Sequence, residues 1–502
     1  RDVIASLIKH KKCLSNDPYE ISPKIRAKLE QTVRWLFGKT PSSSAKLDFT
    51  WSDLQPFSNS SSIQSRRGNG GLLGHLRDDQ GVSRRLQSDL VGVKELGLEV
   101  TWLYSSWFPS EVLADNLLDY SIEMEDNEIP TCAVSVVLEP NKARIVSRGD
   151  ARAYFCLKPI QKWMWRALRR HPQFTLIGEP LTKEIIEDKV LRHWSPGDLV
   201  ISADFEATTD NSSGRATLIL WGEISKYLPI CLGRFASSSI CPQYIQYPAS
   251  KEFVLTPFNQ NHHRDSTLKF EEGPFTPDPI PAKFLQKNGQ LMGSPLSFPL
   301  LCMMNFAVLW ASLEELKGKK IRPSDVHCLV NGDDLLYCGG QDLIKIWERN
   351  ARSIGLLPSL GKNFTSDQFC QLNSELFLLR GSSQGGMVAD GPIPYLNSGL
   401  IRGRGKGMDL EKVSEFFSYV PDSDKYDPEM DCVLNAEGVC SRLLYYGNLM
   451  EDRWLSAYVG SQESKLLSVA PRWLWNIPRK NGGLGLPILE DYSEKQTGYI
   501  HS

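Results

Sequence analysis

One short segment constrains the fold of this chain more than any other. Residues 326–338 (VHCLVNGDDLLYC) consist of two apolar runs separated by a polar turn that contains Gly332 and two adjacent acids, Asp333 and Asp334. Such a pattern predicts a β-hairpin, because glycine adopts the backbone angles that a tight turn requires. The acids then lie at the tip, where their charges repel each other. Acids in turns are often only solvated surface residues, so the segment alone leaves a structural and a functional interpretation open.

A second acidic segment follows another predicted strand. Residues 197–210 (GDLVISADFEATTD) begin as a buried strand and end in a polar turn with Asp204 and Asp210, and a helix is predicted over 211–226. Carboxylates from two neighbouring strands can hold two divalent cations ~3.5–4 Å apart, as nucleotidyl transfer requires. Mg²⁺ takes oxygen ligands, usually one or two carboxylates with water and substrate phosphates. Asp204, Asp333 and Asp334 therefore predict a two-metal centre, although nucleases and phosphatases use the same arrangement.

Basic residues gather in one part of a chain that is almost neutral. The 502 residues carry a formal net charge of −2, yet residues 142–170 hold nine lysines and arginines against one acid, Asp150. Pro159 predicts the start of a helix in this segment. An apolar face recurs at helical spacing after it, formed by Ile160, Met164, Ala167 and Leu168. A solvated helix face is the ordinary explanation of such a run, but in this chain the local excess favours phosphate binding.

The remaining pattern alternates helices and strands in a chain of ordinary globular composition, 41% hydrophobic and 23% charged. Predicted helices cover Ile25–Phe37, Phe298–Leu313, 341–354 and much of the C-terminal third, and predicted strands cover 131–137, 144–146 and 373–380. The apolar stretch Phe298–Leu313 falls short of the ~18 residues of a membrane span, so no span is expected. The 11 scattered cysteines predict reduced thiols and a reducing compartment. The first residue is Arg1 rather than Met, so we expect the natural N-terminus to lie upstream.

Eight segments form an ordered series from about residue 60 to residue 487. They are 60–71 (SSSIQSRRGNGG), Lys142–Arg148, Asp204–Asp210 (DFEATTD), Gly289–Asn305 (GQLMGSPLSFPLLCMMN), Gly332–Asp334, Lys362 within LGKNF, Asn373–Leu378 and 481–487 (NGGLGLP). In this order they resemble the template-entrance segment, the basic fingers motif, the first four palm motifs, the following strand and a C-terminal signature of viral RNA-dependent RNA polymerases. The group most resembled comprises the ourmia-like, narna-like and mito-like replicases, kin to RNA phage replicases. The departures are Phe205 and Glu206, where relatives often have Leu-Ser.

The resemblance implies a role for each matched residue in the palm. Asp204 and Asp333, supported by Asp334, would bind two Mg²⁺ ions, for which Mn²⁺ can substitute, and Lys362 would protonate the departing pyrophosphate as a general acid. The predicted contacts with the ribose and the nascent base pair come from Asp210, Asn305, Gly293 and Ser294. A ribose 2′-hydroxyl is the group that separates RNA from DNA, and a carboxylate with an amide can bind it.

The basic residues would hold phosphates. The resemblance assigns the triphosphate to Lys142, Arg144 and Arg148. Basic residues beside them, Arg66, Arg67, Lys158 and Arg166, are expected to bind RNA. The expected partners are the RNA template, the nascent RNA and NTPs, and viral or host partner proteins are left open by the sequence. The expected location is the host cytoplasm, or the mitochondrion as in some members of the group.

The fold class implied by the resemblance is α+β, a right-hand polymerase whose palm is an antiparallel sheet backed by helices. The expected divisions are a basic extension at 1–50, fingers at 51–194, palm at 195–226, a fingers insertion at 227–288, palm at 289–385 and a helical thumb at 386–502. Three alternatives remain open: a reverse transcriptase, a non-catalytic RNA-binding protein with a degenerate palm, and a metal-dependent nuclease. Against the first, Asn331 and Gly332 precede the aspartates where reverse transcriptases usually have a tyrosine.

Overall fold

The computed structural model describes most of the chain before residue 394 and short stretches after it. The described residues are 2–38, 61–66, 71–72, 75, 129–139, 142–228, 230–247, 283–359, 361–383, 385–393, 440, 459–460, 462–464, 466–467, 471–477 and 483–486. The chain divides into two compact units, and the first consists of Arg1–Val137, Ala143–Leu255 and Thr267–Ile393. The second consists of Leu138–Lys142, Thr256–Ser266 and Pro394–Ser502. The domain boundaries expected from the sequence stay predictions.

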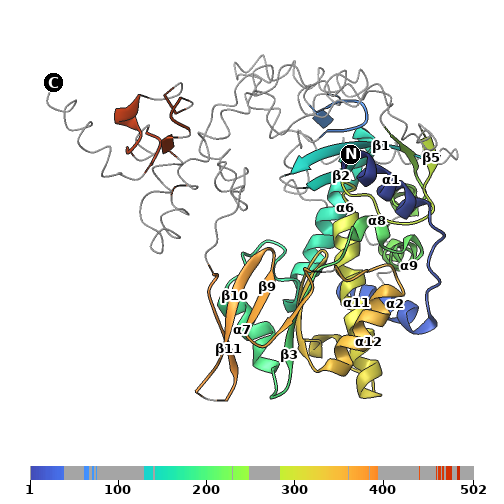
Figure 1. Ribbon diagram of the computed structural model, residues 1–502. Coiled ribbons are helices and arrows are strands. Elements are labelled where there is room, and N and C mark those ends of the chain that lie inside the picture. Colours follow the sequence, from blue (N-terminus) through green and yellow to red (C-terminus); the bar gives the residue numbers. More distant parts are fainter. Residues whose placement is uncertain are drawn as a thin grey trace, which may run out of the picture. The chain divides into compact units, whose positions relative to one another are not determined.

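The centre of the first unit is a four-stranded antiparallel sheet (Figure 1). Its strands are β3 (Leu199–Ala203), β6 (Cys328–Asn331), β7 (Asp334–Gly339) and β8 (Phe364–Ser366), in the order β6-β7-β3-β8. Successive residues of a strand point to opposite faces. Here both faces are covered, since Ile201 belongs to one buried cluster and its neighbour Val200 to another. The predicted hairpin and the predicted antiparallel palm sheet are both confirmed.

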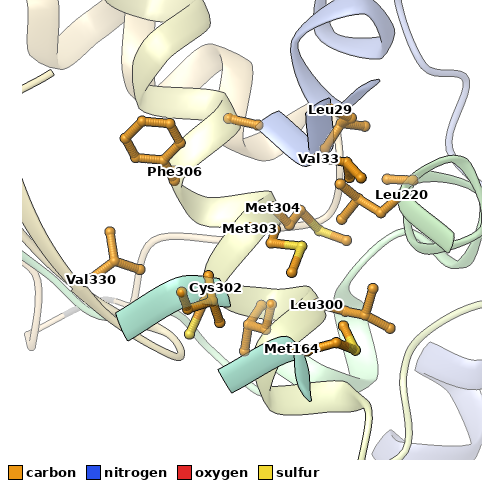
Figure 2. Close-up of a cluster of buried hydrophobic side chains, with 14 of the residues drawn as sticks. Leu29, Val33, Met164, Leu220, Leu300, Cys302, Met303, Met304, Phe306 and Val330 are labelled. Atoms are coloured by element: carbon orange, nitrogen blue, oxygen red, sulfur yellow. The ribbon is translucent and has the colours of Figure 1, made fainter. Parts of the chain in front are cut away.

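Four of the helices that contribute to the main core pack together beside this sheet. They are α2 (Pro23–Phe37), α9 (Gly214–Ile224), α11 (Ser297–Lys317) and α12 (Gln341–Arg352). The long helix α11 is apolar on nearly all sides and packs against the other three, so its side chains meet those of α2 and α9 around Met303 and Met304 (Figure 2). In the described part of the chain, α11 is the helix long and apolar enough to cross a membrane, yet 89% of its most apolar window is buried. It is therefore a core helix.

A second four-stranded sheet belongs to the region predicted as fingers. Its strands are β1 (Thr131–Glu139), β2 (Lys142–Arg148), β4 (Tyr244–Gln246) and β5 (Lys283–Leu285), in the order β2-β1-β4-β5. The N-terminal helix α1 (Asp2–Ser15) packs on it through Leu7 and Leu14. The predicted strands at 131–137 and 144–146 are confirmed.

The basic helix begins earlier than the sequence predicted. Helix α6 (Ala151–Arg169) starts at Ala151, because the Asp150 carboxylate accepts a hydrogen bond of 2.9 Å from the Ala153 amide and caps the first turn. The prediction of a start at Pro159 is wrong, since this proline lies inside the helix. The predicted apolar face is correct, and all four of its side chains are fully buried: Ile160, Met164, Ala167 and Leu168.

A third sheet contacts the palm. It contains β9 (Phe369–Leu372), β10 (Glu375–Gly381) and β11 (Met387–Asp390), in the antiparallel order β11-β10-β9. The strand predicted at 373–380 begins two residues later, because Asn373 and Ser374 adopt left-handed turn angles between β9 and β10. The other described helices are α7 (Lys183–Lys189), α8 (Thr208–Asn211), α10 (Ile230–Ser238) and the short 3-10 helices η5 (Pro172–Phe174), η6 (Leu191–His193), η7 (Ser225–Tyr227) and η8 (Pro323–Asp325).

In the second unit, the described C-terminal residues form one local structure. The glycine motif 483–486 returns along η10 (Arg472–Leu474) and the residues after it, since the Leu484 amide donates to the Leu474 carbonyl and the Leu486 amide to the Trp475 carbonyl. A Cβ at Gly483 would lie 2.0 Å from the Ile477 carbonyl oxygen, so the close approach requires glycine. Most of the predicted helical thumb lies outside the described residues.

Candidate active site

The two adjacent acids lie at the tip of the β6–β7 hairpin, as the sequence predicted. Asn331 pairs with Asp334, so Gly332 and Asp333 form a two-residue turn, with φ of +69° at Gly332. A Cβ at Gly332 would lie 3.0 Å from the Phe298 ring. A side chain at this position would therefore be strained both by the backbone angle and by α11 beneath it.

Helix α11 holds the hairpin tip from below. The Gly332 amide donates to the Cys302 sulfur over 3.1 Å. The Asn305 side-chain amide donates to the Gly332 and Asp333 carbonyls over 3.4 and 3.3 Å. Asn305 is fully buried. The structure therefore shows Asn305 supporting the hairpin backbone through its side-chain amide, and the ribose contact expected from the resemblance stays a prediction.

Asp204 follows β3 directly and reaches the same end of the sheet. Ala203 pairs with Leu335, so the antiparallel register sets the next residue, Asp204, beside the start of β7 at Asp334. The Asp204 carbonyl accepts the Ser359 amide over 2.9 Å, which fixes the turn after β3. The three predicted metal-binding acids therefore gather at one sheet end.

A hydroxyl joins the two acidic segments. Thr208 lies four residues beyond Asp204, and its Oγ1 donates to Asp333 Oδ2 over 3.1 Å. The same oxygen lies 3.2 Å from the Phe205 carbonyl. Thr208 is buried. Nothing in the local sequence singled out this threonine, because its partner is more than a hundred residues away.

Lys362 is the cation of this site. Its ammonium lies 3.7 Å from Asp204 Oδ2, and its side chain is 65% exposed. The predicted proximity of Lys362 to the acidic site is therefore observed. Its role as a general acid stays a prediction.

The donor set suits magnesium. Carboxylate oxygens at adjacent strand ends are hard ligands, and Mg²⁺ commonly takes one or two of them with substrate phosphates and water. Within the described ranges, no group of three or more His, Cys, Asp or Glu side chains is close enough together to hold a metal ion. An ion at this site would therefore need further ligands, such as substrate phosphates and water.

Asp210 lies at the end of the same turn, on α8. Its side chain is 16% exposed, and its Oδ1 accepts a hydrogen bond of 3.2 Å from the Thr209 hydroxyl. The Gln290 amide donates to the Thr209 carbonyl over 2.6 Å, so the start of the second palm motif touches the end of the first. This contact joins two motifs that are eighty residues apart in the sequence.

The Gly293–Ser294 loop packs against strand β2. Ser147 donates to the Met292 carbonyl through both its amide and its hydroxyl, each over 2.7 Å. Gly293 has φ of +123°, and a Cβ there would lie 2.2 Å from the Ser147 carbonyl oxygen. Ser294 is half-buried. Glycine at 293 is therefore required by a backbone contact between the loop and β2.

The basic residues surround the junction of β2, α6 and the 61–66 segment. Arg148 donates to the Ser62 carbonyl over 3.0 Å, and its pKa is lowered by burial and by the neighbouring charge of Arg66. A bound anion would stabilise the charged form of Arg148, which the positive charge of Arg66 disfavours. The pair is therefore suited to bind an anion. Arg144 is half-buried on β2.

The other predicted basic residues are placed in part. Lys158 donates to the Gln161 side chain over 3.1 Å, and Gln161 donates to the Pro295 carbonyl, which links α6 to the second palm motif. Arg166 is half-buried in the last turns of α6. The Lys142 side chain and the whole of Arg67 lie outside the described residues.

These features define a class. An antiparallel palm sheet backed by helices, with acids at one sheet end and a glycine loop and basic residues beside them, is the arrangement of right-hand nucleic-acid polymerases. No protein-family model matches the chain. The crystal structure of the RNA-dependent RNA polymerase of a human picorbirnavirus superposes with a TM-score of 0.50, over 95% of this chain and 77% of that one, at 11% identity. The fold is therefore that of a viral RNA-dependent RNA polymerase, and the expected α+β right-hand class is confirmed.

Sequence relatives narrow the resemblance. The RNA-dependent RNA polymerase of Ourmia melon virus (isolate Melon/Iran/VE9) is 28% identical over 443 residues, which are 86% of this chain and 47% of that protein. The RNA-directed RNA polymerase of Saccharomyces 20S RNA narnavirus is 25% identical over 273 residues, 51% of this chain and 28% of that protein. The likeness to the ourmia-like and narna-like replicases is thus confirmed. The chain spans less than half the length of both relatives.

Proposed function

We propose that this chain catalyses RNA-directed RNA synthesis in the replication of a viral RNA genome. The observation that carries the proposal is that Asp204 and Asp333 lie at the same end of the palm sheet, where Thr208, four residues after Asp204, donates to Asp333. This end also carries Asp210 and Lys362. The relatives named RNA-dependent RNA polymerase support the same activity.

Different residues of the chain would perform different parts of the reaction. Arg148 and Arg144, with Lys142, would bind the triphosphate, and Asp210 would bind the ribose. Asp204 and Asp333, with Asp334 beside them, would hold two Mg²⁺ ions, for which Mn²⁺ can substitute; when bound, these ions supply the positive charge that activates the 3′ hydroxyl and neutralises the leaving group. Lys362 would give a proton to the pyrophosphate as it departs.

The template would be recognised by shape and charge rather than by base edges. Base pairing selects the nucleotide, so the protein needs only to hold phosphates and sugars in place. Arg66 and Lys158 lie near the β2–α6 junction, and Arg166 lies further along α6. We assign these three residues, with Arg67, to the RNA backbone.

Labelled-NTP incorporation on a single-stranded RNA template with Mg²⁺ tests the proposal. The wild type should make template-length RNA, whereas Asp204→Ala and Asp333→Ala should make none and still bind RNA. Asp367→Ala is a matched control, because Asp367 is an exposed turn aspartate next to Ser366, which pairs with Val200 at the opposite end of the sheet. Full activity of either site variant would overturn the metal assignment.

The same assay separates the alternatives. Incorporation of deoxyribonucleotides in preference to ribonucleotides would indicate a reverse transcriptase. Shortening of the template without synthesis would indicate a nuclease. RNA binding without incorporation, across templates, primers and Mn²⁺, would indicate a non-catalytic palm and would overturn the proposal.

A further inference from the structure

The N-terminal helix α1 is fastened to the turn that carries Asp210. Helix α1 contacts α8 directly, and the Lys287 and Asn288 amides donate to the Leu14 carbonyl over 2.9 and 3.1 Å. A Cβ at Gly289 would lie 2.5 Å from the Leu14 side chain and 2.7 Å from the Asp210 carbonyl oxygen. Helix α1, the end of the first palm motif and the start of the second therefore meet at one point, near the α1 and α8 labels in Figure 1.

One buried histidine of α1 lies between Asp210 and a tyrosine. His10 Nε2 is 3.8 Å from Asp210 Oδ1, and His10 Nδ1 is 2.7 Å from the Tyr247 hydroxyl. The histidine and tyrosine rings meet edge to face, with centroids 5.9 Å apart. The Tyr247 ring is in turn stacked on Phe284. His10 and Tyr247 are both buried, so the ring of His10 is fixed on both sides.

The protonation states agree with this geometry. Burial lowers the pKa of His10 to about 4, so the ring is neutral at physiological pH. Burial, and then the charge of Asp210, raises the pKa of Tyr247, so its phenol keeps its proton. The phenol can therefore donate to Nδ1, which leaves the proton of the neutral ring on Nε2, facing the Asp210 carboxylate.

A second side chain of α1 holds the other end of the same turn. Lys9 forms an ion pair with Glu206, which lies four residues before Asp210. Glu206 is a position where the sequence departs from its relatives. Two successive residues of α1 thus contact both ends of the segment 206–210.

We propose that His10, held by Tyr247, is a positioning residue for sugar selection, and that it orients the Asp210 carboxylate toward the ribose of the incoming nucleotide. This inference rests on the proposed function and on the ribose-binding role of Asp210 within it. The N-terminal helix is then part of the device that separates ribonucleotides from deoxyribonucleotides, although it lies two hundred residues before the palm motif that it supports.

Two variants remove the polar contacts of His10 and keep an aromatic ring of similar volume in its place. His10→Phe keeps a ring of similar size but removes both nitrogens, and Tyr247→Phe removes only the hydroxyl that orients the histidine. Ile8→Ala is the matched control, because Ile8 is on the same helix but 45% exposed. The measurement is the ratio of kcat/KM for an NTP to that for the matching 2′-dNTP.

We expect this ratio to fall about tenfold in both variants, the size of effect that orienting partners of polar ligands often have. The fall should come mainly from a raised KM for the NTP, and Ile8→Ala should keep the wild-type ratio. An unchanged ratio in an active Tyr247→Phe protein would overturn the inference. So would an equal loss of NTP and dNTP incorporation, which indicates a purely structural role.

The controls separate this inference from the proposed function. If the wild type synthesises RNA and the ratio is unchanged in both variants, the inference fails and the proposed function stands. If the wild type incorporates no nucleotide, the proposed function fails, and the inference falls with it. If His10→Phe does not fold, Tyr247→Phe decides the matter, since it leaves the packing of the ring in place.

Discussion

At the scale of single residues, the Thr208 hydroxyl is the direct link between the two acidic segments. Thr208→Val keeps the shape of the side chain and removes the donor to Asp333. A hydrogen bond to a charged group contributes about 1.5–3 kcal/mol, which corresponds to a fall in kcat of roughly 10–100-fold if the carboxylate loses its orientation. Thr208→Ser should keep most of the activity. A rate of nucleotide incorporation equal to that of the wild type, measured for Thr208→Val in single-turnover assays, would contradict this role.

Asn305 supports the same hairpin from helix α11. Asn305→Leu preserves the volume but leaves the Gly332 and Asp333 carbonyls without this donor. We expect the free energy of unfolding to fall by about 1–3 kcal/mol, as for other buried polar groups that lose a partner. Urea denaturation measures this change. A variant as stable as the wild type, with altered ribose selection alone, would show that Asn305 contacts the sugar instead.

The acids proposed to bind metal were easier to place from the sequence than the residues that hold them. Asp204 follows an apolar strand, and Asp333 and Asp334 lie between two apolar runs, so the local pattern placed them at strand ends, whereas their metal-binding role was inferred from the ordered series of motifs. Thr208 and His10 gave no such signal, because each acts through a partner more than a hundred residues away. Asn305 was assigned to the ribose from its place in a motif, and its second role, a hydrogen bond from its amide to the hairpin backbone, could not be found from the sequence.

At the scale of elements, the contact between the Gly293 loop and strand β2 ties the palm to the basic residues. Gly293→Ala would force a side chain into φ of +123° and to 2.2 Å from the Ser147 carbonyl. Left-handed or more extreme angles cost a residue with a side chain about 1–3 kcal/mol, so the loop should move away from β2. We expect NTP incorporation to fall at least ~10-fold while RNA binding persists. Ser294→Ala, which leaves the backbone unstrained, is the comparison.

Helices α2, α11 and α12 are joined at Glu315. This residue of α11 accepts a hydrogen bond of 2.6 Å from Lys24 of α2 and another from Arg349 of α12. The hydrogen bond from Lys24 is the largest cause that lowers the pKa of Glu315 to about 2, with Arg349 and Asn350 adding to it against burial. Because the folded pKa is below the ordinary value of 4.5, the stabilisation is present above pH 4.5 and is lost as the pH falls toward 2.

Glu315→Gln should therefore destabilise the protein at neutral pH by about 1 kcal/mol, since the pair is partly exposed. The difference from the wild type should shrink as the pH is lowered from 4.5 to about 2, the window set by the two pKa values. Chemical denaturation at several pH values measures it. A difference that is constant over this range would mean that the carboxylate charge contributes nothing.

Elements were predicted well where one periodicity dominated. The hairpin, α11 and α12 have clear apolar patterns, and all three were found. The start of α6 was misplaced because Pro159 is a strong signal for a first helical turn. The sequence alone did not show that the helix begins eight residues earlier, at Ala151, where Asp150 caps it. The strand β10 was placed two residues early, because Asn373 and Ser374, although ordinary turn residues, were counted as part of the strand instead of the left-handed turn before it.

At the scale of the whole molecule, the fold persists where the sequence does not. The picorbirnavirus polymerase shares 11% of its residues with this chain and yet superposes over 95% of it. In this chain the palm sheet is buried on both faces and an apolar helix lies beneath the acidic hairpin, and many apolar sequences satisfy both demands. Sequence alone could predict the palm because its motifs are local, whereas the fingers assemble from distant segments such as 61–66 and β2.

The net charge of −2 means that the proposed RNA binding must depend on local charge. Each lysine or arginine that contacts a phosphate releases counterions, so the logarithm of affinity falls linearly with the logarithm of salt concentration. For single strands the slope is about −0.7 for each contact.

Arg66→Gln and Arg166→Gln should therefore each make the slope less steep by ~0.7, with little change in preference among RNA sequences. Lys345→Gln, an exposed lysine of α12 on the helical layer behind the palm, should leave the slope unchanged. Fluorescence anisotropy with a labelled single-stranded RNA, repeated over a range of salt concentrations, measures all three slopes. Equal slopes for the arginine variants and the wild type would mean that the template follows another path, because neutralising a true phosphate contact cannot leave the number of released ions unchanged.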